Sequence, residues 1–592
     1  MIQTVYAQKQ DDKKDTFFLA KKKGLIGRLA KSISVEQTAQ QPVKSEIPYI
    51  KYQGRIIRNI ELLSVGFQGN VNDSTVVKKD LGIKLSNIFH KNTTNKVLYK
   101  NLFFKEGDRL FPYLIADNER YLRQQPFFQD ARIDVEEAPE NPDSVDVYVI
   151  TKDVFSIGGS LNISNNHRGE VVIKEENLAG SGSRLLVSGF YDMPRNPTTA
   201  FGAEFLRRNV HGSFADWTIG YQNYHDAFNT GRKEETTIYT RIDRPLVSPY
   251  FATTGSFEAD YNYTTDAYIP DSIYRKNSRY SFLNLDAWYG YNFGTKKFLY
   301  RNLKSRYRKF IALRAFHQDF IASPIKGLNI YDYRYANITG FLAGFTLFKQ
   351  DFFHTNYIYG FGINEDVPEG YNFSVVGGWT NKQGRQRPYY GIDFQHSHLN
   401  HKGFFTNYLA RLGGFYYNGN FEDIDLLLNL EHFTRLKRLN SRWYTRTFYG
   451  GSFTYQINNV LNPPLFLESQ FGLPYFNNGP VVAYSRVTAK LETVFYNTWK
   501  FLGFRMAPFG FSDISLLTPN NQSLNKTDGY SAIGAGVRTR NENLVFGTIE
   551  LKGYYFPRTT VDMNWWKIEF NSNIRFRYTS TLLHRPEFVV DN

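Results

Sequence analysis

Hydrophobic and polar side chains alternate with a period of two over most of this chain. Such alternation puts the apolar groups on one face of a β-strand. It recurs from Val154 to Tyr578 without a segment of helical period that could cover the apolar face, so we expect a lipid bilayer to cover it. In the last such stretch the residues of apolar parity are Trp566, Ile568, Phe570, Ile574, Phe576 and Tyr578.

Residues 154–578 are therefore expected to form an all-β transmembrane barrel. The chain holds no run of about 18 apolar residues, which a helical span would need, and a closed barrel also satisfies every backbone N–H and C=O group in lipid. Roughly 25 residues per strand and connection predict about 16 antiparallel strands. After a first strand at Val154–Ser164 and the hairpin that follows it, the expected strands are Trp217–His225, Thr237–Asp243, Gly255–Tyr263, Phe282–Asn292, Phe310–His317, Gly340–Lys349, Phe373–Trp379, Phe404–Tyr417, Thr445–Gln456, Val487–Phe495, Ala532–Arg538, Leu544–Tyr555 and Trp566–Tyr578.

Residues 53–153 show a mixed periodicity, which predicts a small α+β domain. A three-stranded sheet with two helices on one face is the economical arrangement of such elements. The predicted elements are a strand at Arg55–Phe67, helices at Lys96–Phe104 and Phe111–Gln125, and two strands around Ile133 and Val147.

Three pieces of this domain resemble a known module. Leu102–Asp108, Pro126–Ala131 and Val145–Val149 resemble, in order and spacing, a polypeptide-transport-associated (POTRA) domain. A hairpin motif follows at Asn177, Leu178, Gly180 and Gly182, where the glycines permit a tight or bulged backbone and Asn177 can bond nearby main chain. Together these pieces resemble the BamA/TamA-like bacterial surface antigen family, which implies a periplasmic POTRA-like domain followed by an outer-membrane barrel.

The resemblance also implies a barrel seam at which the first strand pairs with the last. Glycine inside a strand weakens it, so such a seam could open and accept a client strand by β-augmentation. The seam residues would be Ile157, Gly158, Gly159 and Leu161 in the first strand and Phe570, Ile574, Phe576 and Tyr578 in the last.

A lumenal loop is a second feature that the resemblance implies. The family carries an Arg-Gly-Phe/Tyr tip on a long loop inside the barrel. At the matching place this chain has Phe471, Gly472 and Tyr475 without the arginine, ahead of a Phe509–Asp513 segment that resembles the family pattern.

The ends of the sequence carry three further expectations. Residues 1–7 resemble the end of a signal peptide. Residues 8–52 form a basic tail in which Phe17–Ser34 is either disordered or a short amphipathic helix that could plug the barrel. Residues 579–592 form a tail beyond the last strand.

Composition and charge narrow the function classes. Cysteine is absent, which excludes disulfides and a cysteine nucleophile. The formal net charge of +15 is spread through strands and turns, so we expect a basic barrel interior or contacts with anionic lipid and no nucleic-acid binding.

No motif for an enzyme or a cofactor stands out, so neither is expected. His396, His398 and His401 could approach a metal, but a polar strand end is the favoured interpretation. A membrane lipase is the enzyme alternative, but it would have no need of a polypeptide-binding domain.

The leading hypothesis is an outer-membrane protein insertion or assembly factor that captures clients with its POTRA-like domain and adds their strands at the seam. Two alternatives stay open: a two-partner-type secretion pore with an N-terminal plug, and a structural or porin-like barrel. The expected partners are the lipid bilayer, unfolded outer-membrane or secreted polypeptides, and periplasmic or lipoprotein accessory subunits.

Overall fold

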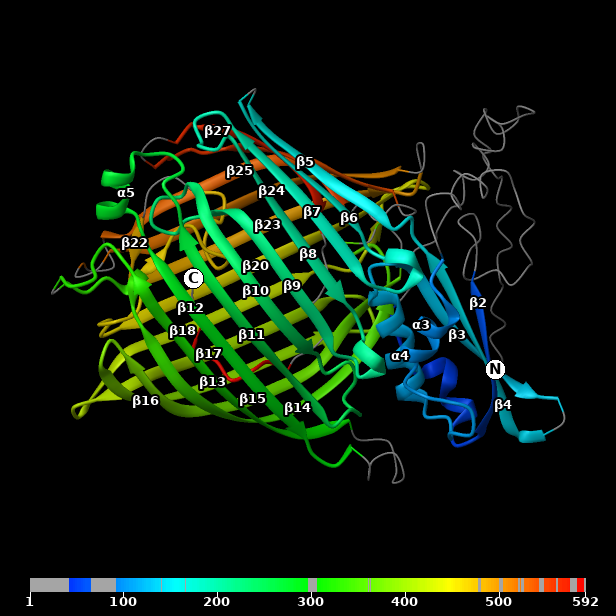
Figure 1. The fold of residues 1–592 in the computed structure, drawn as a ribbon. Coiled ribbons are helices and arrows are strands. Elements are labelled where there is room, and N and C mark those ends of the chain that lie inside the picture. Colours follow the sequence, from blue (N-terminus) through cyan, green and yellow to red (C-terminus); the bar gives the residue numbers. More distant parts are fainter. Residues whose placement is uncertain are drawn as a thin grey trace.

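A computed structural model gives the fold of the chain (Figure 1). It describes residues 42–64, 92–139, 141–165, 167–295, 306–328, 330–359, 361, 364–476, 481–499, 504–519, 522, 526–541, 548–560, 563–574 and 583–589.

Twenty antiparallel strands form a barrel in the described part of the chain. The largest sheet has 22 strands, of which β1 (Val43–Lys44) and β19 (Lys437–Arg438) are two-residue additions. Successive strands are neighbours, and the sheet order places the last beside the first, so the barrel is nearly closed (Figure 1). The twenty are β5 (Ile157–Asn165), β6 (Arg168–Glu175), β7 (Arg184–Asp192), β8 (Thr199–Arg207), β9 (Asp216–Asp226), β10 (Lys233–Arg244), β11 (Thr253–Thr264), β12 (Ser281–Asn292), β13 (Tyr307–Ala322), β14 (Ile338–Thr355), β15 (Glu365–Lys382), β16 (Arg385–Leu399), β17 (Phe405–Tyr417), β18 (Asn420–Phe433), β20 (Trp443–Ile457), β23 (Ser485–Asn497), β24 (Phe504–Thr518), β25 (Asp528–Asn541), β26 (Thr548–Tyr555) and β27 (Trp566–Ile574).

The expected count of about 16 strands was wrong. The span from β5 to β27 holds about 21 residues per strand, because turns such as Gln383-Gly384 and Asn418-Gly419 are only two residues long. Strands β8, β16, β18 and β24 were missing from the expected set. In β24, Pro508 and Gly510 interrupt the alternation that marks a strand, although both lie within its ladder.

The barrel is apolar outside and mostly polar inside. On β13, Ile311 and Leu313 are exposed, whereas Arg308, Phe310 and Ala312, which have the opposite parity, are buried. This alternation is typical of an outer-membrane barrel, whose outer face contacts lipid. No helix within the described ranges is long and apolar enough to cross a membrane.

A small α+β domain precedes the barrel and confirms the predicted elements. Its sheet has the order β2-β4-β3, with β2 parallel to β4 and β3 antiparallel to it. Leu98, Ile115 and Leu122 from its two helices share a buried core with the sheet, and the first helix is shorter than predicted. The elements are β2 (Ile56–Ser64), α3 (Asn95–Lys100), α4 (Pro112–Gln124), β3 (Phe128–Ala138) and β4 (Asn141–Asp153), preceded by the 3-10 turn η2 (Ile47–Tyr52).

Short elements lie in the connections of the barrel. Within residues 458–484, the connection between β20 and β23, a small hairpin folds inward; we call this connection the lumenal loop. The short elements are η3 (Leu178–Gly180), η4 (Val210–Gly212), α5 (Asp271–Asn277), η5 (Tyr333–Tyr335), β21 (Leu465–Phe466) and β22 (Val482–Ala483).

Part of the expected N-terminal tail is structured. Residues 8–41 lie outside the described ranges, so neither expectation for Phe17–Ser34 is addressed. Val43 and Lys44, however, pair with the end of β14, and Tyr49 and Tyr52 pack in the core of the small domain. The chain therefore contacts the barrel before it enters the small sheet.

Candidate functional site

The predicted hairpin motif lies where the barrel meets the small domain. Asn177 is fully buried, and its Nδ2 donates to the hydroxyl of Thr93 at 3.0 Å, while its Oδ1 accepts from the N–H of Gly182 at 2.8 Å. Gly180 has a φ of +73°, and a Cβ there would lie 2.5 Å from the carbonyl oxygen of Asn92. Leu178 is exposed. The motif thus forms its own turn, and its glycine leaves room for the close approach of the chain that leads into α3.

A second turn, missed in the sequence, repeats this geometry 32 residues later. Asn209 Oδ1 accepts from the N–H of Phe214 at 2.8 Å, and Asn209 Nδ2 donates to the carbonyl of Lys100 at 2.9 Å. Gly212 takes a positive φ of +82°. The signal was present as Asn-x-x-Gly-Ser at 177–181 and again at 209–213. The two turns hold opposite ends of α3.

Helix α4 makes the second part of the junction through buried charges. Arg123 donates to both carboxylate oxygens of Asp366, at 2.8 Å through Nη2 and 3.2 Å through Nε, and also binds Glu119. Burial acts to raise the pKa of Glu119, but Arg123 and further partners hold it below the ordinary value. Asp117 Oδ1 forms an ion pair at 3.2 Å with Nη2 of Arg306, which immediately precedes β13. The helix is therefore ion-paired to two separate strands.

Asp130 is a titratable group at the same junction. Its Oδ2 accepts from Asn364 Nδ2 at 3.1 Å, across the boundary between β3 and the β14–β15 connection. Burial raises the pKa of Asp130 from 3.8 to about 6, although Arg123 opposes the shift.

The seam residues have the following placement. Ile157, Gly158, Gly159 and Leu161 lie in β5, where a Cβ on Gly159 would sit 2.3 Å from the carbonyl oxygen of Val172 on β6. Phe570 lies in β27 with its side chain exposed, and Ile574 ends that strand. Phe576 and Tyr578 lie outside the described residues. Strands β27 and β5 are neighbours in the sheet order, and how the seam acts stays a prediction.

The three lumenal-loop candidates come together on the inner wall. Tyr475 donates its hydroxyl to Asp513 of β24 at 2.6 Å, and the carbonyl of Phe471 accepts from Ser452 of β20 at 2.7 Å. Gly472 permits a close turn, since a Cβ there would lie 2.3 Å from the carbonyl oxygen of Leu467. A tyrosine hydroxyl therefore contacts the carboxylate of the Phe509–Asp513 segment, in a loop whose tip has no arginine.

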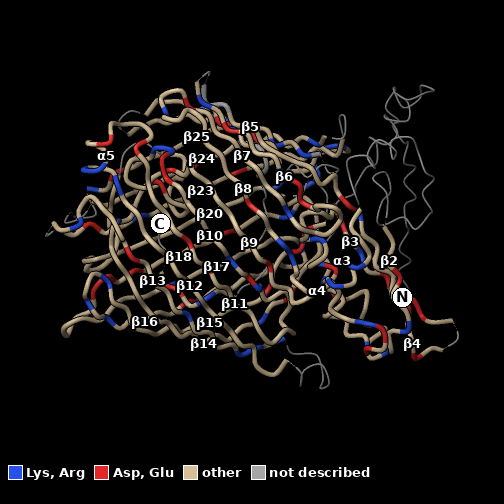
Figure 2. The backbone as a smooth tube through the Cα atoms, in the orientation of Figure 1, with Lys and Arg blue, Asp and Glu red and all other residues tan. Residues whose placement is uncertain are grey.

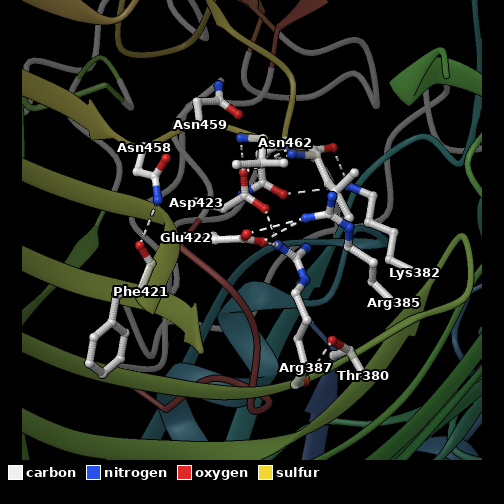
Figure 3. Close-up of polar contacts among 12 residues, drawn as sticks. Thr380, Lys382, Arg385, Arg387, Phe421, Glu422, Asp423, Asn458, Asn459 and Asn462 are labelled. Atoms are coloured by element: carbon white, nitrogen blue, oxygen red, sulfur yellow. Dashed lines mark hydrogen bonds and ion pairs between the residues drawn. The ribbon is translucent and has the colours of Figure 1, made fainter. Parts of the chain in front are cut away.

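The root of the lumenal loop is fixed at the barrel end opposite the small domain, beside the β15–β16 and β17–β18 turns. Figure 3 shows its polar contacts. Asp423 of β18 has a φ of +49°, and its Oδ1 accepts from the N–H groups of Val460 at 2.6 Å and Leu461 at 2.9 Å. Arg387, buried on β16, pairs with Asp423 and lies 3.3 Å from Glu422. The loop therefore enters the barrel from a rigid anchor.

A second segment, which follows β27, also lies in the lumen. Residues Leu583–Val589, the lumenal segment, contact β12 to β17, and red chain is visible within the barrel in Figure 1. A cavity of about 330 Å³ remains between this segment and the lumenal loop, with Gln470 and Phe471 on one side and His584–Glu587 on the other. Sequence reasoning placed residues 579–592 in a tail and missed this location.

Arginines of the inner wall hold the inserted chain by its main-chain carbonyls. Arg505 donates to the carbonyl of Phe361 in the β14–β15 connection at 2.5 Å, and Arg486 donates to that of Phe466 in the lumenal loop. Arg314 and Arg411 do the same for the lumenal segment, each at 3.1 Å. The positive charge expected in the interior is thus used to bind inserted backbone, while Figure 2 shows blue and red residues scattered along the barrel strands.

The histidine cluster does not form a metal site among the described residues. His396 and His398 share a face of β16 with parallel rings 6.4 Å apart. His396 Nδ1 lies 3.1 Å from the carbonyl of Gly370, and His398 Nδ1 lies 2.9 Å from Glu369. His396 and His398 thus lie near the end of β16 with protein partners of their own.

Comparisons with known proteins give likenesses in fold. No protein-family model and no curated protein matches the chain. Among solved structures, BamA from Haemophilus ducreyi lacking POTRA domains 1–3 is 11% identical, with 88% of this chain and 83% of that chain covered and a TM-score of 0.33. CdiB from Acinetobacter baumannii is 9% identical, with 92% and 79% covered and a TM-score of 0.40. CdiB from Escherichia coli is 9% identical, with 88% and 76% covered and a TM-score of 0.40. Likenesses at this level do not assign a function to the chain.

Proposed function

We propose that this chain is an outer-membrane assembly factor that captures polypeptides with a periplasmic POTRA-like domain and passes their strands into the membrane at the β5–β27 seam. One observation carries the proposal. The central strand of the small sheet, β4, ends at Asp153, and seam strand β5 begins at Ile157. Only residues 154–156 separate a sheet that could capture a client from the strand that would receive it.

The small domain is suited to capture by strand addition. Its order β2-β4-β3 leaves β2 and β3 at the edges of the sheet. The middle of β3 is bonded to Glu119 and Tyr49, and the start of β2 is bonded to residues 107–110. The edge that we propose for an extended client chain is therefore the part of β2 after Ile60. The two Asn-x-x-Gly-Ser turns and the Arg123–Asp366 pair hold this domain against the barrel. A client bound at its edge would therefore be kept close to the membrane.

The seam supplies a route that needs no cofactor. Gly158 and Gly159 weaken β5, and a client that pairs with the freed edge buries its apolar face in lipid. Accessory subunits, whether periplasmic or lipoprotein, would bind on the exposed side of the small domain.

A cross-linking experiment tests the proposal in vesicles that contain the purified protein. Because the chain has no cysteine, pairs can be introduced cleanly. Phe570→Cys would be combined in turn with cysteines at Ile157–Leu161 to lock the seam, and the control pair Leu551→Cys with Phe570→Cys would lock two strands that are paired in register. Folding of an unfolded client barrel should stop in the seam-locked protein and continue in the control. Equal folding rates would refute insertion at the seam.

Export through the lumen is a second candidate. The lumenal loop, the lumenal segment and the β14–β15 connection lie inside the barrel and leave a cavity of about 330 Å³. Depletion of the protein in cells separates the two functions. General loss of outer-membrane barrels supports insertion, whereas loss of a single secreted protein supports dedicated export. No loss of either supports a structural or porin-like barrel.

A further inference from the structure

The lumenal segment lies against the inner wall without helix or strand structure, and its chain bends at Pro586. Arg314 of β13 donates to the carbonyl of Pro586, and Arg411 of β17 donates to the carbonyl of Phe588. Both carbonyls therefore face the inner wall. Main-chain carbonyls occur in every polypeptide, and these two contacts therefore do not depend on side-chain identity.

Two apolar sites flank the polar contacts. The ring of Phe588 packs among Tyr389, Phe415 and Phe316, with centroid distances of 4.8, 5.2 and 5.6 Å. Near the other end, Leu583 is buried in a cluster with Phe310 and Phe348. The wall thus offers one apolar pocket for an aromatic side chain and one for an aliphatic side chain, at the two ends of the segment.

The arginines of the wall keep partners of their own. Arg314 binds Asp286 at 2.7 Å, and Arg411 binds Asp393 at 2.8 Å, so both remain paired if the segment leaves. The segment adds Arg585 to Asp286 at 2.8 Å and Glu587 to Arg411 at 3.2 Å. Its departure would leave no buried arginine without a carboxylate.

Glycines make the room in which the segment lies. A Cβ on Gly344 would lie 3.1 Å from Pro586 Cγ, so a larger side chain there would displace the segment. A Cβ on Gly413 would first meet the Tyr389 hydroxyl, at 2.2 Å, and Val589 Cγ2 at 3.1 Å, so Gly413 makes room for Tyr389 of the aromatic pocket. The cavity beside residues 584–587 also extends the groove beyond its present occupant.

From these observations we propose that the inner wall over β12–β17 is a binding groove for a polypeptide stretch without secondary structure, and that residues 583–589 are its tethered occupant. The groove binds backbone carbonyls through arginines, one aromatic side chain in the pocket around Tyr389, and an acidic side chain at Arg411. A polypeptide that enters the lumen must displace the segment. This site is separate from strand addition at the seam and does not depend on it.

Peptide binding tests the proposal directly. The probe is a fluorescent peptide with the sequence of residues 583–589, added to the refolded full-length chain and to a variant that lacks residues 583–592. The truncated chain should bind the peptide and the full-length chain should bind it at least tenfold more weakly, because its groove is occupied. Equal binding to both chains, or no binding to the truncated chain, would overturn the proposal.

Substitutions in the truncated chain identify the groove. Gly344→Val should weaken peptide binding at least tenfold, whereas Gly450→Val, an inward position on β20 whose nearest neighbour is Lys490 Cβ at 3.5 Å, should leave it within twofold. A similar loss in both variants would contradict the assigned location.

Cross-linking covers the case in which the truncated chain does not fold. In the full-length chain, Tyr389→Cys with Phe588→Cys should form a disulfide on mild oxidation, and excess peptide should slow its formation. Absence of the cross-link, or a rate unaffected by the peptide, would sink the proposal.

Discussion

The junction of the small domain and the lumenal segment both use arginine–carboxylate pairs, but the two regions differ in burial. The side chains of Arg123 and Asp366 are 5% and 6% exposed. In the two pairs that join the lumenal segment to the wall, Arg585 and Asp286 are 38% and 10% exposed, and Glu587 and Arg411 are 24% and 11% exposed. Breaking a buried pair leaves an uncompensated charge, while a partly solvated pair separates at little cost. The comparison indicates that the junction is permanent and that the lumenal segment can exchange.

The largest expected effect is the loss of the buried pair at the junction. Arg123→Met leaves Asp366 and Glu119 without their cation and should destabilise docking by about 3–5 kcal/mol. Urea unfolding and protease sensitivity of the small domain in detergent measure it. Adding Asp366→Leu to Arg123→Met should recover part of the loss, because one stranded charge is then removed.

A surface pair in the same domain provides the control. Arg132 and Asp134 are 2.7 Å apart, but their side chains are 43% and 35% exposed. Arg132→Met should therefore change stability by less than about 1 kcal/mol. Equal losses in Arg123→Met and Arg132→Met would remove the basis for a permanent junction.

The next effect concerns the close approach at the hairpin motif. Gly180→Ala and Gly231→Ala both place alanine at a positive φ, +73° and +68°, which costs about 1–2 kcal/mol in each. At Gly180 the new Cβ would also meet the carbonyl of Asn92 at 2.5 Å, whereas nothing lies within 4 Å at Gly231. Gly180→Ala should thus lose a further 1–3 kcal/mol or so in urea unfolding.

If Gly180→Ala and Gly231→Ala unfold alike, the glycine of the motif serves its turn alone. The contact with residues 92–94 would then not contribute to docking.

A smaller effect is the pH dependence at Asp130. Because its pKa in the folded chain, about 6, lies above its ordinary value of 3.8, the protonated form is favoured in the docked state. That stabilisation is fully present below about pH 4 and is lost as the pH rises through 6. Docking should therefore strengthen by about 1 kcal/mol between pH 7 and pH 5.

Urea unfolding of the small domain at the two pH values measures this change. Asp130→Asn carries no titratable group at this position and should abolish this part of the pH dependence. A wild-type slope that persists in Asp130→Asn would contradict the assignment of the effect to Asp130.

The smallest expected effect on global stability is at the lumenal segment. Phe588→Ala empties the aromatic pocket but leaves both arginine–carboxylate pairs of the wall intact. The free energy of unfolding of the barrel should stay within about 0.5 kcal/mol of wild type, while proteolysis within residues 583–589 should become faster. A large fall in barrel stability would mean that the segment is part of the structural core.

The sequence was sufficient for the elements that depend on local periodicity. Alternation around Ile311 and Leu313 marks a membrane strand, and the apolar spacing of Ile115 and Leu122 marks α4. Strand β24 was missed because Pro508 and Gly510 interrupt the same signal.

The candidate site was predictable only in part, because its contacts join residues far apart in the chain. Asn177 was found for its turn, but its bond to Thr93 depends on how two domains dock. Arg123 and Asp366 are 243 residues apart, and nothing in their local sequence pairs them. The lumenal segment carries no periodic signal at all, and its place in the barrel follows from tertiary contacts with Arg314 and Arg411.

Hydrogen exchange of the native protein, followed by mass spectrometry, tests the contrast between the two regions most directly. The account predicts that amides in Leu583–Val589 open with a free energy at least about 2 kcal/mol below that of amides in α4 and in the two Asn-x-x-Gly-Ser turns. It also predicts that the cavity-facing wall of β12–β17 stays protected while the segment opens. Exchange of the segment and the junction in one cooperative unit, at the same free energy, would contradict it.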